Sequence, residues 1–214
     1  MTPPRQKGLK NPQTNFRRLP RTPKPVSFGP MTTSPETLRP PLAALAAAPA
    51  TTTVRRLWKA LTPDERAEAV SAALTDDPEG WVKNSTRGAI ALALRFRPQT
   101  VATWPRAKLV SEAARLPLDD AQLLSAYLVD LHLGHRRAMM GSFLDSLGIT
   151  NDDGRIDSET TTVPEQDPAA LGKAADALVV QFGVNEVVTY LLTLLLQDAA
   201  TWRGVTGWLE ARGA

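Results

Sequence analysis

The chain's two histidines, His132 and His135, are the residues whose type and spacing best suit chemistry. Three positions apart on a predicted helix, they could share a metal ion or supply a general base, and Asp130 is nearby. The HExxH order is absent, however, and Arg136 and Arg137 would repel a cation. We therefore expect both histidines to be structural or surface residues, with no bound metal and no cofactor.

A second chemical pattern is the acidic stretch Asn151–Asp157. With Gly154 at the sixth position and Ile156 at the eighth, it matches a calcium-binding EF-hand loop. The first and twelfth ligand positions then fall on Ile149 and Thr160, which cannot supply the required carboxylates. The stretch predicts an ordinary acidic turn.

Catalytic and nucleotide-binding motifs are otherwise missing. There is no cysteine, which excludes disulfides, thiolate metal sites and cysteine nucleophiles. No GxxxxGK[ST], GxGxxG or GxSxG occurs. The sequence therefore leans away from an enzyme, although an unfamiliar active site stays open.

Residues 1–50 differ in composition from the rest. They hold eleven of the eighteen prolines, with eight basic residues and one acid for a net charge of +7, whereas the other 164 residues have a net charge of −4. Proline removes backbone donors and the segment is poor in apolar residues, which predicts a disordered tail. The alanine-rich stretch Leu38–Ala50 could form two helical turns or a stiff linker, and we expect the linker. Met31 is an alternative start that would remove seven of the eight basic residues.

From Thr51 onward the apolar spacing is helical, and it predicts an all-α fold. We expect a bundle or an array of antiparallel helix pairs with about seven to eight short helices. Residues 51–148 form the N-terminal part, 149–167 an acidic polar loop, and 168–214 C-terminal helices on the same core. The expected helices include ones near 54–61, 63–74, 85–96, 106–115, 119–148 (with a bend near Gly134), 168–182, 184–199 and 201–211. A short hairpin within 154–163 is the most β-structure that we expect.

Residues Ile90–Trp104 carry the one motif with a family likeness. Ile90, Ala91, Leu94, Thr100, Val101 and Trp104 match the pattern IAxxLGVSxxTVxxW. The segment resembles the helix-turn-helix of DNA-binding regulators, whose second helix enters the major groove. Arg95 replaces the turn glycine, and Pro105 ends the second helix early. We expect two packed helices joined by an Arg-Pro corner, with Val101 and Trp104 in the core.

Two features bear on packing. The apolar helix Val187–Leu196 is too short to span a bilayer, and we expect it in the core or, failing that, in a homodimer contact. Trp58, Trp81, Trp104 and Tyr127 recur every 23 residues, and we expect them to be structural anchors without a true repeat.

The functional prediction is a non-catalytic helical protein–protein interaction or scaffolding module, in the cytoplasm, with an unknown protein partner or a second copy and without insertion into a membrane. The N-terminus lacks the apolar stretch of a signal peptide. The alternative is a nucleic-acid-binding protein that uses the tail and the helix-turn-helix-like segment. Its candidate phosphate or base contacts are Arg17, Arg18, Arg21, Arg95, Arg97, Thr100 and Arg106.

Overall fold

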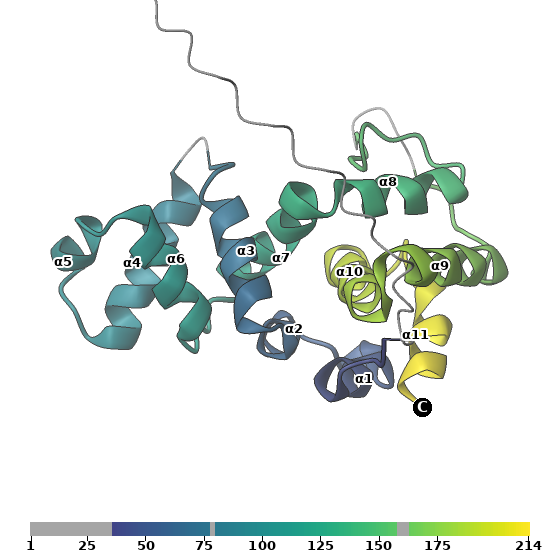
Figure 1. Cartoon of the computed structure of the whole chain (residues 1–214), viewed down its shortest axis with the longest axis horizontal. Helices are drawn as coiled ribbons and strands as arrows, with labels where there is room; N and C mark the ends of the chain where they lie inside the picture. Colours follow the sequence, from purple (N-terminus) through teal and green to yellow (C-terminus); the bar gives the residue numbers. More distant parts are fainter. Residues whose placement is uncertain (1–35, 78–79, 158–162) are drawn as a thin grey trace, which may run out of the picture. The chain divides into compact units, whose positions relative to one another are not determined.

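The computed structural model describes residues 36–77, 80–157 and 163–214, and within them the chain is helical (Figure 1). These residues form eleven α-helices and one 3-10 helix and contain no strand, only an isolated bridge between Asp152 and Arg155. The helices are α1 (Pro40–Ala46), η1 (Pro49–Thr51), α2 (Val54–Ala60), α3 (Pro63–Ala73), α4 (Trp81–Leu94), α5 (Pro98–Ala102), α6 (Arg106–Arg115), α7 (Ala121–His135), α8 (Arg137–Ser146), α9 (Pro168–Phe182), α10 (Val184–Gln197) and α11 (Val205–Gly213). The predicted all-α class is confirmed, with more helices than expected.

Local sequence signals set several helix starts. The Thr62 hydroxyl accepts a hydrogen bond from the Glu65 backbone N–H at 3.2 Å, and the Glu65 carboxylate accepts one from the Thr62 N–H at 2.8 Å. This reciprocal capping box satisfies two backbone donors at the start of α3. The carboxylates of Asp120 and Asp167 cap α7 and α9 by accepting hydrogen bonds from backbone N–H groups in the first turn.

The predicted linker Leu38–Ala50 is wrong, because most of this stretch is helical. Leu42, Leu45 and Ala46 of α1 are buried, and α1 packs against α2, α10 and α11. Pro40 and Pro41 occupy the first turn of α1, where the missing N–H costs nothing. The helical body therefore begins before Thr51, whereas residues 1–35 of the predicted tail lie outside the described residues.

The long helix expected from 119 to 148 is two helices. The break falls at Arg136, with φ −131° and ψ 24°, and not at Gly134. Gly134 lies instead where α7 crosses α3, since a Cβ added there would be 2.8 Å from the Cβ of Ala72. The glycine thus permits close helix packing.

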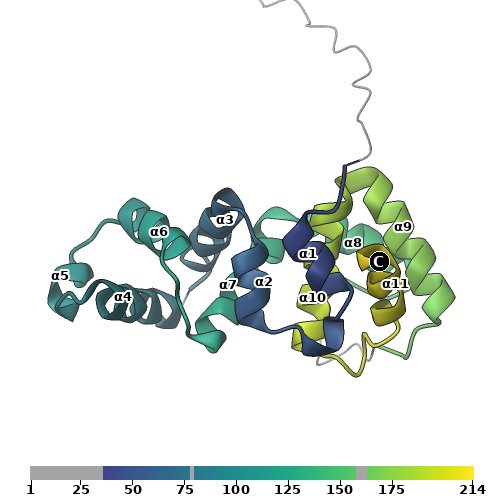
Figure 2. The same ribbon diagram turned by 90° about the horizontal axis from the view of Figure 1, so that it is seen from below.

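A single hydrophobic core joins helices from α1 to α11. At its centre α10 contacts α1, α2, α7, α9 and α11, and nine of its residues are buried (Figure 2). The prediction that the apolar helix Val187–Leu196 belongs to the core is confirmed. None of the helices in the described part of the chain has the length and apolar character needed to cross a bilayer.

The four expected aromatic anchors do not play equivalent parts. Trp58 and Tyr127 are buried and in contact, with ring centroids 5.4 Å apart, and the Tyr127 hydroxyl lies 2.6 Å from that of Thr86. Trp104 is only half-buried, and Trp81 is exposed. The prediction that Trp81 is an anchor is therefore wrong, and the 23-residue spacing does not reflect a repeated packing site.

Helices α4, α5 and α6 lie together on the side of α3 away from α1 and α2 (Figures 1 and 2). Helix α4 contacts α5, α6 and α7, and α6 contacts α3. Only one side of α4 is covered by these neighbours: Val82, Thr86 and Ile90 are buried, whereas Gly88 and Leu92 on the opposite side are exposed.

Candidate functional site

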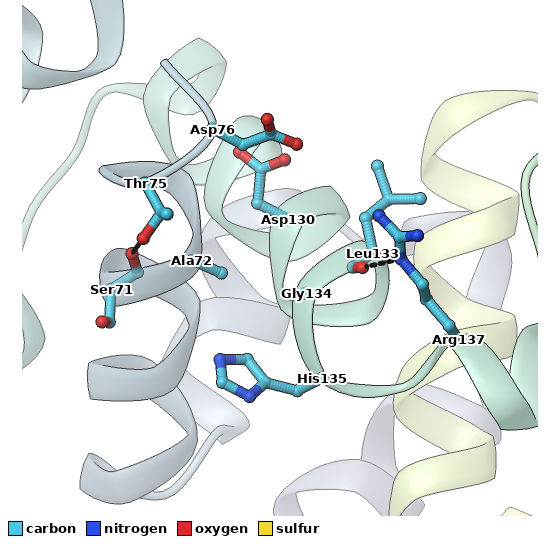
Figure 3. A pocket seen from close by; sticks show the side chains of 9 residues that line it. All are labelled: Ser71, Ala72, Thr75, Asp76, Asp130, Leu133, Gly134, His135 and Arg137. Carbon is cyan, nitrogen blue, oxygen red and sulfur yellow. Dashed lines mark hydrogen bonds between the residues drawn. The ribbon is translucent and has the colours of Figure 1, made fainter.

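A hollow of about 340 Å³ lies between α3 and α7 and contains the chain's second histidine (Figure 3). Asp76, at the end of α3, and Asp130 of α7 point toward each other, while His135 lies at the opposite edge (Figure 3). Arg155 reaches the Asp76 carboxylate at 3.3 Å. The hollow therefore holds two carboxylates and one imidazole, and the imidazole lies apart from the two carboxylates.

Asp130 is the group in this hollow with an altered acidity. Burial raises the pKa of its carboxyl to about 6, repulsion from Asp76 adds to the effect, and Arg155 opposes it. Such a carboxyl can exchange a proton near neutrality. The Thr75 hydroxyl, however, donates to the Ser71 carbonyl at 2.8 Å rather than toward Asp130. The hollow thus lacks an aligned nucleophile and base.

His132 faces away from this hollow and into the core. Its Nε2 lies 3.2 Å from the Thr193 hydroxyl, and its ring meets that of Tyr190 edge-on. Burial lowers the pKa of the imidazole well below its usual value, and the nearby Arg136 lowers it further. The two histidines therefore do not share a metal, and among the described residues no three His, Cys, Asp or Glu side chains converge as ligands.

Arg136 occupies the junction of α7 and α8, almost fully buried. Its guanidinium lies 3.5 Å from Glu65 and 3.4 Å from Glu186. Glu65 also receives two hydrogen bonds from Arg39, at 2.7 and 3.0 Å. These charges join the start of α1 to α3, and the α7–α8 junction to α3 and α10.

The acidic stretch forms a turn, as expected for its described residues. The Asn151 side chain accepts from the Gly154 N–H at 2.9 Å and donates to Asp145 at 2.8 Å. Asp153, with φ +48°, pairs with Arg137 at 3.3 Å. Thr160 and the rest of 158–162 lie outside the described residues.

The helix-turn-helix-like segment has a turn of the right kind and a second helix that is too short. Arg95 takes the left-handed conformation of the turn glycine that it replaces, with φ +55°, although a β-carbon disfavours this conformation. A bond of 2.9 Å from the Phe96 N–H to the Ala91 carbonyl closes the helix end around it. Helix α5 then ends at Ala102 after five residues, and Val101 is buried.

The polar residues predicted to contact nucleic acid from this segment are exposed. Arg95, Arg97 and Thr100 lie on the surface around α5. Arg106 instead binds its own chain, since its guanidinium donates to the Ser71 carbonyl at 2.6 Å and contacts the Thr75 hydroxyl. The expected position of Val101 in the core is confirmed, whereas Trp104, also expected in the core, is only partly buried and packs against it. Arg17, Arg18 and Arg21 lie outside the described residues.

An exposed apolar surface runs along α4, and the sequence analysis missed it. We name it the α4 face: Trp81, Ser85, Gly88, Leu92 and Phe96. The first four recur at helical spacing on the side opposite the buried residues, and Phe96 lines the same hollow as Gly88 and Leu92. The exposed fractions are 38% for Trp81, 83% for Leu92 and 47% for Phe96.

Positive charge gathers in the same part of the chain. Residues 81–115, which span α4 to α6, hold seven basic residues and one acid, for a net charge of +6. Residues 116–214 hold six basic and fourteen acidic residues, a net charge of −8. A charge count in a moving window could have found this contrast. The small total charge of the chain and the strongly basic N-terminal segment hide this contrast between 81–115 and 116–214.

Comparison with known proteins adds no functional information. The chain matches no protein-family model, no curated protein and no solved structure.

Proposed function

We propose that the chain is a non-catalytic helical protein–protein interaction or scaffolding module that binds a partner through the α4 face. One observation carries the proposal. Four large apolar side chains are exposed in the described residues, and three of them, Trp81, Leu92 and Phe96, lie on this one face. The fourth, Val180, stands alone on α9. Single exposed apolar residues are ordinary on protein surfaces, whereas a contiguous group marks an interaction site.

Aromatic residues and leucine on one helix face provide anchors that bury apolar area, each contributing about 1.5–3 kcal/mol when fully covered. The half-exposed Trp81 and Phe96 rings are suited to this because they lose little conformational freedom when a partner covers them.

Site-specific photocrosslinking tests the proposal. A photoreactive phenylalanine analogue at position 92 should form discrete protein adducts in a lysate of the source cells, whereas the same analogue at Val180 should not. Both positions are highly exposed, at 83% and 87%, so that accessibility is matched. Equal adducts at both positions, or none at either, would contradict a partner site on α4.

A nucleic-acid-binding function is the second candidate, favoured by the net charge of +6 over residues 81–115 and by the exposure of Arg95, Arg97 and Thr100. Helix α5 is too short to read a groove, so that this function would rest on phosphate contacts. Retention on a DNA or RNA matrix that falls steeply with salt, and that weakens in a variant carrying Arg95→Asn and Arg97→Gln, would support it.

A further inference from the structure

We propose that a basic hollow between α3, α4 and α6 binds the phosphate group of a small phosphate monoester. The hollow measures about 150 Å³ and lies where α6 packs against α3 and α4 (Figure 1). It is lined by Leu74, Lys83, Arg87, Trp104, Arg106 and Leu109. Helical spacing places Lys83 and Arg87 on the side of α4 away from Leu92, so the proposal does not depend on a partner at the α4 face.

Three cations line this hollow without a carboxylate among them. Lys83 and Arg87 are four residues apart on α4, which brings two like charges together on one side of the helix. The Arg106 guanidinium donates to the Ser71 carbonyl at 2.6 Å and to the Thr75 hydroxyl, both of which are neutral acceptors. None of the three cations forms a salt bridge within residues 36–77, 80–157 and 163–214. Their positive charges are therefore available to an anion.

Arg87 also carries a hydrogen-bond donor that the fold leaves unused. Its Nε is buried and has no hydrogen-bond partner in the described part of the chain. The carboxylate of Asp77, just before α4, instead accepts from the backbone N–H groups of Val82 and Lys83, at 3.2 and 2.8 Å. A buried donor without an acceptor is unfavourable, so its place in a basic hollow points to an acceptor that a ligand supplies.

A phosphate monoester matches these groups better than a carboxylate or a phosphodiester does. Its phosphate carries a charge of about −1.5 to −2 near neutral pH and presents three acceptor oxygens. A carboxylate or a phosphodiester carries a single negative charge, which compensates less of the positive charge around the hollow. Arginine donates directed N–H bonds to phosphate oxygens, and lysine adds a point charge.

The size and walls of the hollow restrict the rest of the ligand. At about 150 Å³ it is smaller than the roughly 300–1,000 Å³ of typical small-molecule pockets, so it can enclose a phosphate and the few atoms next to it. Leu74, Trp104 and Leu109 provide apolar walls beside the cations. The Lys108 amino group lies 3.8 Å from the centre of the Trp104 ring and adds a fourth cation nearby. The group attached to the phosphate is therefore apolar or flat.

Phenyl phosphate and phenyl sulfate provide a test, because they have nearly the same shape and differ by about one charge at neutral pH. Each is titrated into the full chain at low salt and followed by the indole N–H signal of Trp104 in NMR spectra, which Trp104→Phe assigns. Phenyl phosphate should bind at least ~10-fold more tightly than phenyl sulfate. Inorganic phosphate should bind more weakly than phenyl phosphate, since it lacks the apolar group.

Variants in the hollow separate this site from a general attraction of anions. Arg87→Gln should weaken phenyl phosphate about tenfold. Lys83→Gln should weaken it less, and because Lys83 is exposed this variant tests the site without disturbing the core. With both changes, phenyl phosphate should bind no more tightly than phenyl sulfate. The matched control combines Lys59→Gln and Lys173→Gln, which remove the same charge from exposed positions on α2 and α9 and should change nothing.

Four results would overturn the proposal. Equal binding of phenyl phosphate and phenyl sulfate, or equal losses in the double variant and its control, would leave only a general attraction. Inorganic phosphate that binds as tightly as phenyl phosphate would assign the hollow to the free ion. Poly-U RNA that displaces phenyl phosphate and needs Lys83 and Arg87 would assign it to a nucleic-acid backbone. No binding of any probe up to about 10 mM would remove the site. Crosslinks at position 92 test the α4 face separately in every case.

Discussion

Arg39 and Glu65 are joined by two parallel hydrogen bonds, at 2.7 and 3.0 Å, between a guanidinium just before α1 and a carboxylate in the first turn of α3. The same carboxylate closes the α3 capping box and lies near the buried Arg136. Burial alone would raise the pKa of Glu65, but the bonds from Arg39 and Thr62 lower it below its usual value.

Glu65→Gln should lower the free energy of unfolding by about 2 kcal/mol at neutral pH, since it leaves Arg39 and Arg136 without their shared charge partner. The folded-state pKa of Glu65 is lowered, so this stabilisation is present above the ordinary carboxyl pKa of 4.5 and is lost as the pH falls through the folded value. Urea unfolding at neutral and acid pH measures both effects. Glu68→Gln, on the exposed side of α3, is the control. Equal losses in the two variants would contradict the role of Glu65.

Leu42→Ala should cost about 3 kcal/mol, because Leu42 of α1 is fully buried and its truncation leaves a cavity. A linker residue would cost almost nothing. The comparison is Ala44→Ser on the exposed side of the same helix, which should change the urea midpoint by little. A Leu42→Ala midpoint indistinguishable from that control would remove α1 from the core.

Helix α1 lies in a stretch for which we predicted a linker, and it separates what the sequence can determine from what it cannot. The composition of Leu38–Ala50 was compatible with two helical turns or with a stiff linker, and Pro40 and Pro41 begin a helix because the first turn needs no N–H donor. By contrast, the Thr62–Glu65 signal and the bounds of α6 and α9 were predictable, since each rests on neighbouring residues alone. The break at Arg136 depends on distant partners, Glu65 and Glu186, which no local pattern reveals.

The same distinction applies to the candidate site. The spacing of Trp81, Ser85, Gly88 and Leu92 shows that they share a helix face, but not whether that face is covered. The α4 face stays uncovered because α4 packs on α5, α6 and α7 through the opposite side, which holds Val82, Thr86 and Ile90. Likewise His132 and His135 could be placed near one another on α7, whereas their opposite environments follow from the positions of α10 and α3.

Two glycines on helices should respond to alanine in opposite directions. Gly88→Ala should raise the free energy of unfolding by up to about 1 kcal/mol, since its Cβ meets nothing and helix propensity improves. Gly134→Ala should lower it by about 1 kcal/mol, since its Cβ would lie 2.8 Å from that of Ala72 and force α3 and α7 apart. Thermal unfolding of the pair checks this. Changes of the same sign would contradict the close α3–α7 packing.

His132 should make the protein less stable in mild acid. Burial lowers its folded-state pKa below the ordinary 6.5, so below that value the unfolded chain binds the additional proton. Stability contributed by the neutral ring is complete above pH 6.5 and is lost as the pH falls toward the folded value. His132→Gln should flatten this loss when unfolding is measured from about pH 8 to about pH 5. An unchanged slope would show that His132 is not the titrating group.

Asp130 should act in the opposite sense. Its pKa is raised to about 6, so the folded state holds a proton more tightly than the unfolded chain, and ionisation at higher pH costs stability. Asp130→Asn should therefore stabilise the protein by about 1 kcal/mol at neutral pH, after allowing for solvent screening of this half-buried group. The gain should vanish below about pH 4. Denaturation with Glu210→Gln as an exposed control tests this, and a gain independent of pH would contradict it.

The opposite net charges of residues 81–115 and 116–214 separate charge within the helical body, which the chain's total of +3 conceals. Two proteins with the same total charge can bind a charged surface differently. A protein whose charges are separated turns its oppositely charged side toward that surface. We expect this chain to adhere to both cation- and anion-exchange matrices at low ionic strength. An acidic protein that approaches the helical body itself would meet α4 to α6 more often than random collisions allow.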